Sequence, residues 1–366
     1  MISRILYYSS HPSEVSYLFK MKKEFSQYKP STERLTHLSS RLDDREFCYE
    51  ALKKVSRSFA VVIQQLPKKL QDPVCLFYLI LRGLDTVEDD MSIPQDIKEG
   101  LLINFSDKLK GEPFTLAETG DTEDYRDLML HFDKVCNEYH KLDKSYQDVI
   151  SDITYRMAVG MNKYASQEVN SYDDWDDYCH YVAGLVGIGL SDLFIASELE
   201  SSEKLKDNHL ANEMGLFLQK TNIIRDFAED LEQERVFWPS TAWNQKVEKL
   251  TDLQKNPEKG LEVLNELIIN ALQHIPSCLK YLTELKDIQI FRFCAIPQLM
   301  AVATLGELFS NEDVLYENVK IRKGKTAKYF MSIKSFDQTK KEFIEVLKQI
   351  KKSDKTQTVS KIIDQL

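Results

Sequence analysis

Residues 74–91 read Val-Cys-Leu-Phe-Tyr-Leu-Ile-Leu-Arg-Gly-Leu-Asp-Thr-Val-Glu-Asp-Asp-Met, an apolar run that ends in a cluster of carboxylates. Positions i, i+3 and i+4 of an α-helix share one face, so Asp85, Glu88 and Asp89 are predicted to project together. Two further residues lie on the same stripe one and two turns earlier, Arg82 and Tyr78. Carboxylates at the end of a buried helix are costly unless something compensates them, so this helix end is a candidate site.

A second stretch, residues 226–230, reads Asp-Phe-Ala-Glu-Asp and repeats the Asp-x-x-Glu-Asp pattern of residues 85–89. Acidic residues number 58 of 366, so roughly one or two such triplets are expected by chance and the pattern alone proves nothing. Its context is more informative. Asn222, Asp226 and Asp230 lie at i, i+4 and i+8 and extend a largely apolar segment, with Gln219 one turn earlier.

Oxygen donors of this kind suit magnesium, which proteins bind through one or two carboxylates together with substrate phosphates. Two such helices that face each other would hold several ions and clamp a diphosphate between them. The metal would then act as a Lewis acid in the departure of that diphosphate. A structural network of ion pairs explains the same spacing equally well.

The composition favours long helices. Glycine (12) and proline (10) each make up about 3% of the chain, against roughly 7% and 5% in average proteins. Without a strong shift in composition to mark a linker, a single all-α domain over residues 1–366 is predicted, with Pro73 in the first turn of its helix. A loop is expected over 111–127 and a connector over 250–259. The predicted helices cover 46–66, 73–90, 94–110, 127–165, 173–200, 206–235, 258–286 and 288–310.

The charge and the cysteines narrow the possible functions. A formal net charge of −10 argues against a nucleic-acid binder that works by counterion release, and an anionic ligand would need metal ions or a local basic cluster. No CxxC pair occurs, so zinc ligation and a disulfide framework are not expected, and the cysteines are predicted to be buried thiols. We find no signal peptide and no run of about 18 apolar residues that would span a bilayer.

Six stretches, in this order along the chain, resemble the squalene synthase (farnesyl-diphosphate farnesyltransferase) family. Together they span roughly residues 45–330, which is the expected catalytic core. The resemblance implies a single-domain isoprenoid-synthase helical bundle around a central cavity. The stretches are Ser56-Arg57-Ser58-Phe59, Tyr78-x-x-x-Arg82-x-x-Asp85-Thr86-Val87-Glu88-Asp89-Asp90-Met91, Tyr-Cys-His-Tyr-Val-Ala-Gly-Leu-Val-Gly (178–187), Gln-Lys-Thr-Asn-Ile-Ile-Arg-Asp (219–226), Phe-Cys-Ala-Ile-Pro-Gln (293–298) and Lys-Ile-Arg-Lys-Gly (320–324).

The resemblance also implies a reaction. Two molecules of farnesyl diphosphate condense head to head, with Mg²⁺, to presqualene diphosphate, which is then reduced with NADPH to squalene for sterol biosynthesis. Such enzymes are expected at the endoplasmic reticulum membrane, with the catalytic part facing the cytosol and a C-terminal hydrophobic anchor. The chain ends at Leu366 without that anchor, so either the chain is truncated, which we favour, or this member of the family is soluble. Nothing in the sequence demands more than a monomer, and a monomer is expected.

Roles for individual residues follow from the resemblance. The implied metal ligands are Asp85, Glu88, Asp89, Asn222, Asp226 and Asp230, of which the four aspartates also count as catalytic. Tyr178 is the implied proton-transfer group. A phenol is a poor base near pH 7, so an arginine or the released diphosphate must assist it.

Phosphate and cofactor contacts are implied for Arg57, Arg82, Arg225, Lys320 and Arg322, since the planar guanidinium suits phosphate oxygens. Lys320 and Arg322 belong to a basic cluster that also holds Lys323, Lys325 and Lys328. A solvated basic loop is the alternative interpretation. No GxGxxG fingerprint accompanies the cluster, so a Rossmann domain is not implied.

A lining for the substrate is implied by a set of residues that would each, taken alone, be ordinary core: Ser58, Phe59, Tyr78, Val182, Val186, Leu218, Gln219, Phe293, Cys294 and Pro297. Gly184, Gly187 and Gly189 lie inside a helical run, where each costs about 1 kcal/mol relative to alanine. Close packing against a chain-like substrate and tight helix–helix contact both explain them.

One departure and two rival interpretations remain. Asp192 stands where the resemblance predicts a basic residue. A dehydrosqualene or phytoene synthase would share the first half-reaction and use no NADPH, although residues 320–324 and the Glu88-Asp89-Asp90 sequence favour squalene synthase. A non-catalytic helical scaffold with structural carboxylates is the second rival.

Overall fold

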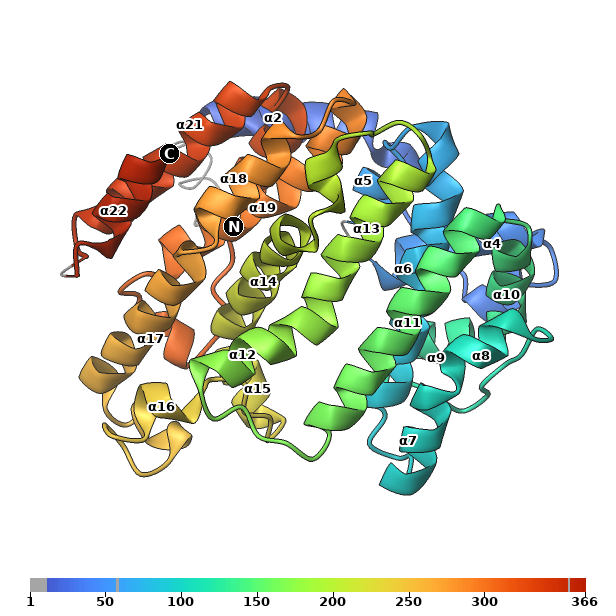
Figure 1. Cartoon of the computed structure of the whole chain (residues 1–366), viewed down its shortest axis with the longest axis horizontal. Coiled ribbons are helices and arrows are strands. Elements are labelled where there is room, and N and C mark those ends of the chain that lie inside the picture. Colours follow the sequence, from blue (N-terminus) through green and yellow to red (C-terminus); the bar gives the residue numbers. More distant parts are fainter. Residues whose placement is uncertain (1–11, 57–58, 355) are drawn as a thin grey trace. The chain divides into compact units, whose positions relative to one another are not determined.

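The computed structural model describes residues 12–56, 59–354 and 356–366. Within these ranges the chain forms helices joined by loops and has no β-strand (Figure 1), so the predicted all-α class is confirmed. Contacts among the described residues separate two compact units. Unit 1 comprises Met1–Ser26, Glu168–Gly187 and Ser202–Leu366, and unit 2 comprises Gln27–Gln167 and Ile188–Ser201. The single domain over 1–366 stays a prediction.

Unit 2 is built around α6, whose side chains from Val74 to Leu81 are buried except for Tyr78. This helix packs against α4, α10 and α11. Residues of α13 (Leu185–Ala196) from Ile188 onward also belong to this unit. The other helices of the unit are α3 (Leu35–Leu38), α4 (Asp44–Val55), α5 (Phe59–Ile63), α6 (Lys68–Asp89), α7 (Gln95–Ile103), α8 (Phe105–Lys110), α9 (Glu123–Leu130), α10 (Phe132–His140) and α11 (Lys144–Tyr164).

Unit 1 is built around α14, which contacts α17, α18, α19 and a π-helix, η2. Its helices are α2 (Pro12–Glu24), α12 (Tyr172–Cys179), η2 (His180–Gly184), α14 (Asn208–Arg225), α15 (Phe227–Glu232), α16 (Ser240–Trp243), α17 (Pro257–Leu272), α18 (Ile275–Thr283), α19 (Ile288–Leu308), α20 (Lys323–Ser332), α21 (Phe336–Lys351) and α22 (Thr358–Gln365). The short 3₁₀ turns are η1 (Ser26–Tyr28), at the boundary between the units, and η3 (Glu203–Lys206), η4 (Leu250–Leu253) and η5 (Glu312–Leu315).

Several predicted helix bounds were wrong. Helix α6 begins at Lys68, directly after Pro67, so Pro73 lies inside this helix and not in its first turn. The predicted helices 127–165, 206–235 and 258–286 are each divided, because the 3.6-residue pattern continues across short breaks that it does not register. The last of these breaks precedes Pro276, which stands at the start of α18, a position that proline favours.

Close helix packing explains all three glycines in the helical run, because a Cβ atom on Gly189 would overlap the side chain of Phe77 on α6. A Cβ atom on Gly184 would overlap the side chain of Asn212, and one on Gly187 would overlap the main-chain carbonyl of Ala211. Both neighbours lie on α14, which also approaches this run through its own Gly215. The structure therefore favours tight helix–helix contact, with the widened π-turn η2 at the point of contact.

The sequence also predicted that the cysteines are buried thiols. All six cysteines are buried and none forms a disulfide, as predicted.

Two helical stretches, Tyr172–Ala196 and Ile288–Leu308, are long and apolar enough to cross a membrane by length and composition. In the second, 72% of the apolar window is buried within the protein, which is typical of a core helix.

Candidate active site

The first acidic motif lies on the last turns of α6. Arg82 reaches both of its predicted neighbours: Nη1 is 3.4 Å from Asp85 Oδ2, and Nη2 donates a hydrogen bond of 3.3 Å to the Tyr78 hydroxyl. The guanidinium also lies over the ring of Tyr125, 5.5 Å from its centroid. The stripe predicted from spacing is therefore present, and Tyr125, which lies on α9, is a neighbour of Arg82 that the sequence did not indicate.

The charged side chains of this motif favour a bound cation beside the carboxylates and a bound anion beside Arg82. Burial raises the pKa of Asp85 to about 6; Arg82 opposes the rise and Asp89 adds to it. A nearby cation would stabilise the ionised form of this carboxylate. The Nε atom of Arg82 is buried and finds no hydrogen-bond acceptor among the described residues, a cost that a suitably placed anionic oxygen would remove.

Neighbours beyond the motif fix the end of α6. The buried Lys98 donates a hydrogen bond of 2.6 Å to the main-chain carbonyl of Glu88. Asp90 accepts hydrogen bonds from the main-chain N–H groups of Ser92 (2.9 Å) and Gly120 (2.8 Å). Burial alone would raise the pKa of Asp90, but these hydrogen bonds, with that from the Ser92 hydroxyl, hold it below its usual value. Asp90 and Lys98 thus position the motif, while Asp89 is exposed.

The second acidic motif spans a break between α14 and α15. The helix α14 ends at Arg225, yet main-chain hydrogen bonds of 2.9 Å run from Asp226 N to the Asn222 carbonyl and from Asp230 N to the Asp226 carbonyl. The i, i+4, i+8 relation of these residues therefore survives the break. Asn222 is exposed, Asp226 is half-buried and Asp230 is buried, so the row runs from solvent into the protein.

Both aspartates of this row are paired with arginines. Arg225 Nε donates to Asp226 Oδ1 at 2.7 Å, which places this predicted phosphate ligand against its own neighbour. Arg235 Nη2 donates to Asp230 Oδ1 at 3.0 Å. Burial raises the pKa of Asp230 to about 6; Arg235 opposes this rise, while Asp226 and Glu229 add to it. In each acidic motif, closely spaced carboxylates thus form ion pairs with arginine side chains.

Tyr178 is connected to the second motif through an aromatic contact. Its half-buried ring stacks on Phe237, with centroids 5.1 Å apart and an interplanar angle of 20°. The guanidinium of Arg235 lies 5.8 Å from the Phe237 centroid while it pairs with Asp230. Sequence reasoning did not identify Phe237 and Arg235 as site residues. Their position shortly after the second acidic motif was the only signal for them in the sequence.

A fully buried lysine holds the helix of Tyr178 to that of Asn222. Lys220 on α14 forms an ion pair with Asp176 of α12, and its Nζ lies 4.8 Å from the Trp175 ring centroid. The same Nζ donates a hydrogen bond of 2.6 Å to Asn270 Oδ1 on α17. Sequence reasoning missed Lys220, because it lies in a short polar stretch, Gln219–Asn222, and the local pattern does not show that its side chain is buried.

The predicted lining residues fall into three groups. Val182, Val186, Leu218, Gln219 and Pro297 are half-buried, whereas Phe293 and Cys294 on α19 are buried. The helices that carry Leu218 and Phe293 are joined by a hydrogen bond of 2.9 Å from Gln298 Nε2 to the Met214 carbonyl. In unit 2, Phe59 is partly exposed and its ring lies 6.1 Å from that of Tyr78. Arg57 and Ser58 lie outside the described residues.

The basic cluster is partly taken up by carboxylates. Arg322 contacts Glu14 and Glu307, Lys325 lies 3.8 Å from Glu307, and Lys328 donates to Glu342 at 2.6 Å. Two lysines of the cluster are exposed, Lys320 and Lys323. Just before the cluster, Asn318 Nδ2 donates a hydrogen bond of 2.6 Å to Glu229 Oε2, which places the start of this segment beside the second acidic motif.

Asp192 belongs to unit 2 and is half-buried. Burial raises its pKa; Arg156 opposes the rise and Asp152 adds to it. A basic side chain is therefore close to this position, but it comes from α11.

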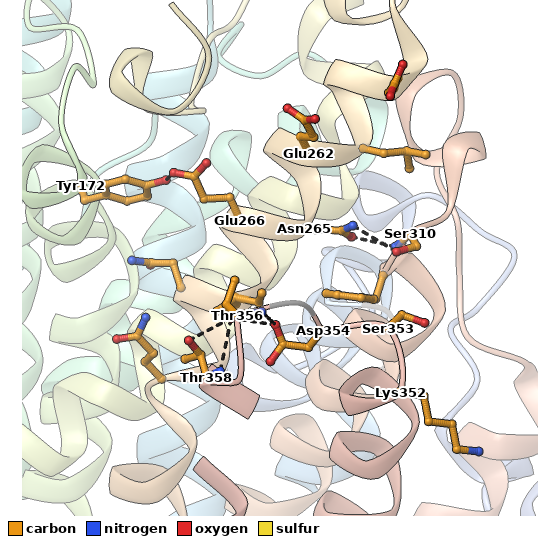
Figure 2. A pocket seen from close by; sticks show the side chains of 16 residues that line it. Tyr172, Glu262, Asn265, Glu266, Ser310, Lys352, Ser353, Asp354, Thr356 and Thr358 are labelled. Carbon is orange, nitrogen blue, oxygen red and sulfur yellow. Dashed lines mark hydrogen bonds between the residues drawn. The ribbon is translucent and has the colours of Figure 1, made fainter. Parts of the chain in front are cut away.

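A cavity of about 1010 Å³ lies elsewhere in unit 1, against α17 and the segment that leads into α22 (Figure 2). Figure 2 shows its polar walls, where Tyr172 donates to Glu266 at 2.5 Å and Asn265 to Ser310 at 3.0 Å. None of the predicted site residues that the structure describes lines this cavity.

Metal ligation by protein side chains alone is not supported. Within the described ranges, no three His, Cys, Asp or Glu side chains converge on a point that would hold a metal ion. Magnesium does not need such a cage, because it keeps waters and shares its ligands with substrate phosphates. The two carboxylate motifs lie in different units, and their predicted facing arrangement stays a prediction.

Solved structures and a family model show which class of protein this chain belongs to. A solved structure of TcSQS in complex with the ligand E5700 superposes with a TM-score of 0.85 at 42% sequence identity, covering 88% of this chain and 96% of that one. The fold is thus that of a helical isoprenoid synthase. Residues 52–325 match the squalene/phytoene synthase family. The chain belongs to that family.

Two relatives that are similar to this chain over most of its length are squalene synthases. A squalene synthase of Nicotiana benthamiana is 51% identical over 287 residues, which cover 77% of this chain and 69% of the relative. Squalene synthase 1 of Arabidopsis thaliana is 46% identical over 325 residues, covering 87% of this chain and 76% of the relative. The predictions of an enzyme, a farnesyltransferase of the squalene synthase type, are confirmed.

Proposed function

We propose that this enzyme condenses two molecules of farnesyl diphosphate to presqualene diphosphate and then reduces that intermediate to squalene. The observation that carries the proposal is the hydrogen bond between Asn318 and Glu229. It brings a basic segment suited to a phosphorylated cofactor next to a carboxylate motif suited to a metal-bound diphosphate.

The residues present fit Mg²⁺. In unit 2, Asp85 and Asp89 offer two carboxylates whose mutual repulsion a cation would relieve, and Arg82 offers an unsatisfied donor to phosphate. In unit 1, Asn222, Asp226 and Asp230 form a second row of oxygen ligands. Bound Mg²⁺ would supply Lewis-acid assistance to the departure of diphosphate. We assign the first motif to the diphosphate of one substrate molecule and the second motif to that of the other.

Tyr178 is proposed to take the proton whose loss closes the cyclopropane ring. Its phenol needs help, because an isolated phenol holds its proton near pH 7. The Phe237 ring fixes the orientation of the Tyr178 ring, and Arg235 contacts the same Phe237 ring, so we propose Arg235 as the arginine that assists the phenol. Lys220 keeps the helix of Tyr178 in register with α14.

The segment from Lys320 to Gly324 is proposed to bind NADPH, which would supply the hydride of the second half-reaction. Two exposed ammonium groups, those of Lys320 and Lys323, are positioned to meet phosphate oxygens. Arg225 and Arg57 are proposed as further phosphate contacts. The substrate chain is assigned to the lining residues of α14 and α19 with Val182 and Val186, and in unit 2 to Ser58, Phe59 and Tyr78.

The setting of the reaction is also a proposal. The substrate and product are long hydrocarbons, so we place the enzyme at the endoplasmic reticulum membrane with its catalytic part facing the cytosol. We propose that it acts as a monomer.

Product analysis tests the proposed function. The purified chain is incubated with farnesyl diphosphate and Mg²⁺, with and without NADPH, and the organic products are identified by mass spectrometry. We expect presqualene diphosphate to accumulate without NADPH and squalene to form with it. A dehydrosqualene-type polyene that forms equally with and without NADPH would refute the reductive step.

A further inference from the structure

The N-terminal helix α2 is attached to unit 1 in an unusual way. It packs against α20, as Figure 1 shows for the blue helix beside the orange and red part of the chain. Glu14 is its only buried residue, at 8% exposure, whereas Phe19 is 71% exposed. Helices normally dock through apolar side chains, and a buried carboxylate is costly unless a cation pairs with it. Beyond the end of α2, the Phe25 ring lies 6.0 Å from that of Phe330 on α20, so within the helix itself the buried contact is the one that Glu14 makes.

Glu14 meets the proposed cofactor segment. Arg322 Nη2 donates to Glu14 Oε1 at 3.0 Å, and Arg322 Nε lies 3.3 Å from the same oxygen. The third nitrogen, Nη1, lies 3.5 Å from Glu307 Oε1. Because carboxylates occupy both sides of the guanidinium, Arg322 has no free pair of donors for a phosphate in this arrangement.

The groups around the Glu14 carboxylate would also favour another anion, such as a phosphate. A Cβ atom on Gly324 would overlap this carboxylate, so the glycine is what allows its close approach. Gly324 lies in the first turn of the ten-residue helix α20, where free main-chain N–H groups and the helix dipole favour negative charge. An arginine, a glycine and a helix start are together a phosphate-binding arrangement, and here a side chain of the same protein fills it.

We propose that Glu14 sets the affinity for NADPH by competing with a cofactor phosphate for Arg322. While Arg322 is paired with Glu14, this carboxylate stands in for the phosphate and keeps α2 docked. Binding of NADPH transfers Arg322 from Glu14 to the phosphate and releases the hold on α2. The inference rests on the proposed role of residues 320–324 in NADPH binding. Glu14 lies outside residues 52–325, which match the family.

The test is the Glu14→Gln variant, which keeps the shape of the side chain and removes its charge. We expect its KM for NADPH to fall roughly fivefold, because the competing ion pair is weakened while the phosphate contact is kept. Formation of presqualene diphosphate without NADPH should stay at the wild-type rate, which also shows that the variant is folded. Glu24→Gln, an exposed glutamate of the same helix, is the matched control and should leave both quantities unchanged.

The opposite outcomes are equally clear. A KM for NADPH that rises in Glu14→Gln would mean that Glu14 positions Arg322 for the cofactor, and an unchanged KM would mean that the two do not compete; either result overturns the proposal. If wild-type protein shows no NADPH-dependent product, the proposed function has failed independently of Glu14. Hydrogen exchange of the α2 amides in wild-type protein gives a second measurement. Faster exchange on addition of NADPH alone supports the competition, and unchanged or slower exchange contradicts it.

Discussion

Replacing Asp85 by asparagine should lower the rate of presqualene diphosphate formation by about a hundredfold to a thousandfold, with little change in melting temperature. The rate falls because the amide cannot supply the negative charge that holds Mg²⁺ against the departing diphosphate. The fold tolerates the change, because Asp85 is crowded by Asp89 and has its pKa raised to about 6 by burial. Steady-state kinetics and thermal unfolding of the same preparation check both parts of this prediction.

Asp107→Asn is the matched control for this experiment. Asp107 lies in the same unit, its side chain is 81% exposed, and its carboxylate lies 3.5 Å from Lys110 on the same helix. It should retain wild-type activity. A variant of Asp85 that unfolds several degrees earlier but keeps its turnover per folded molecule would identify the motif as structural, as the scaffold hypothesis requires.

Replacing Tyr178 by phenylalanine should reduce closure of the cyclopropane ring by about 10²- to 10⁴-fold, the usual range for loss of a general acid–base group. The ring of phenylalanine can still stack on Phe237, so the contact at 5.1 Å is kept and only the hydroxyl is lost. Ionisation of farnesyl diphosphate does not depend on the phenol. Diphosphate should therefore still be released, with farnesol or other shunt products in place of presqualene diphosphate.

The comparison of Tyr178→Phe with Tyr172→Phe isolates the role of the phenol. Tyr172 begins the same helix, and its hydroxyl donates to Glu266 at the wall of the cavity in Figure 2. Its loss should leave the product distribution unchanged. If Tyr178→Phe makes presqualene diphosphate at the wild-type rate, another group takes the proton and the assignment of Tyr178 is wrong.

Local features of the site were predictable from the sequence, because they depend on helical spacing alone. The shared face of Tyr78, Arg82 and Asp85 follows from positions i, i+4 and i+7, and the structure shows the contacts that this spacing requires. The row formed by Asn222, Asp226 and Asp230 follows from the same rule and persists across a helix break. The resemblance to squalene synthases then identified the family and the fold.

Contacts between distant segments were not predictable in this way. Glu14 and Arg322 are separated by 308 positions, and nothing in either local pattern indicates that they meet. The same holds for Lys220, whose partners Asp176 and Asn270 come from two other helices. Helix ends were also missed. The start of α6 at Lys68 was missed because Pro73 was taken as a first-turn residue, and other ends were missed because apolar periodicity continues across short breaks.

The central claim is that these carboxylate motifs bind a diphosphate together with Mg²⁺, and a melting experiment tests it most directly. Thermal unfolding of the wild-type chain is measured with Mg²⁺ alone, with a non-reactive thio-analogue of farnesyl diphosphate alone, and with both. Because a ligand that binds only the folded state stabilises it by RT ln(1 + [L]/Kd), we expect both together to raise the melting temperature by on the order of 5 °C. Each alone should raise it far less. An unchanged melting temperature with both present at saturating concentration would contradict the claim.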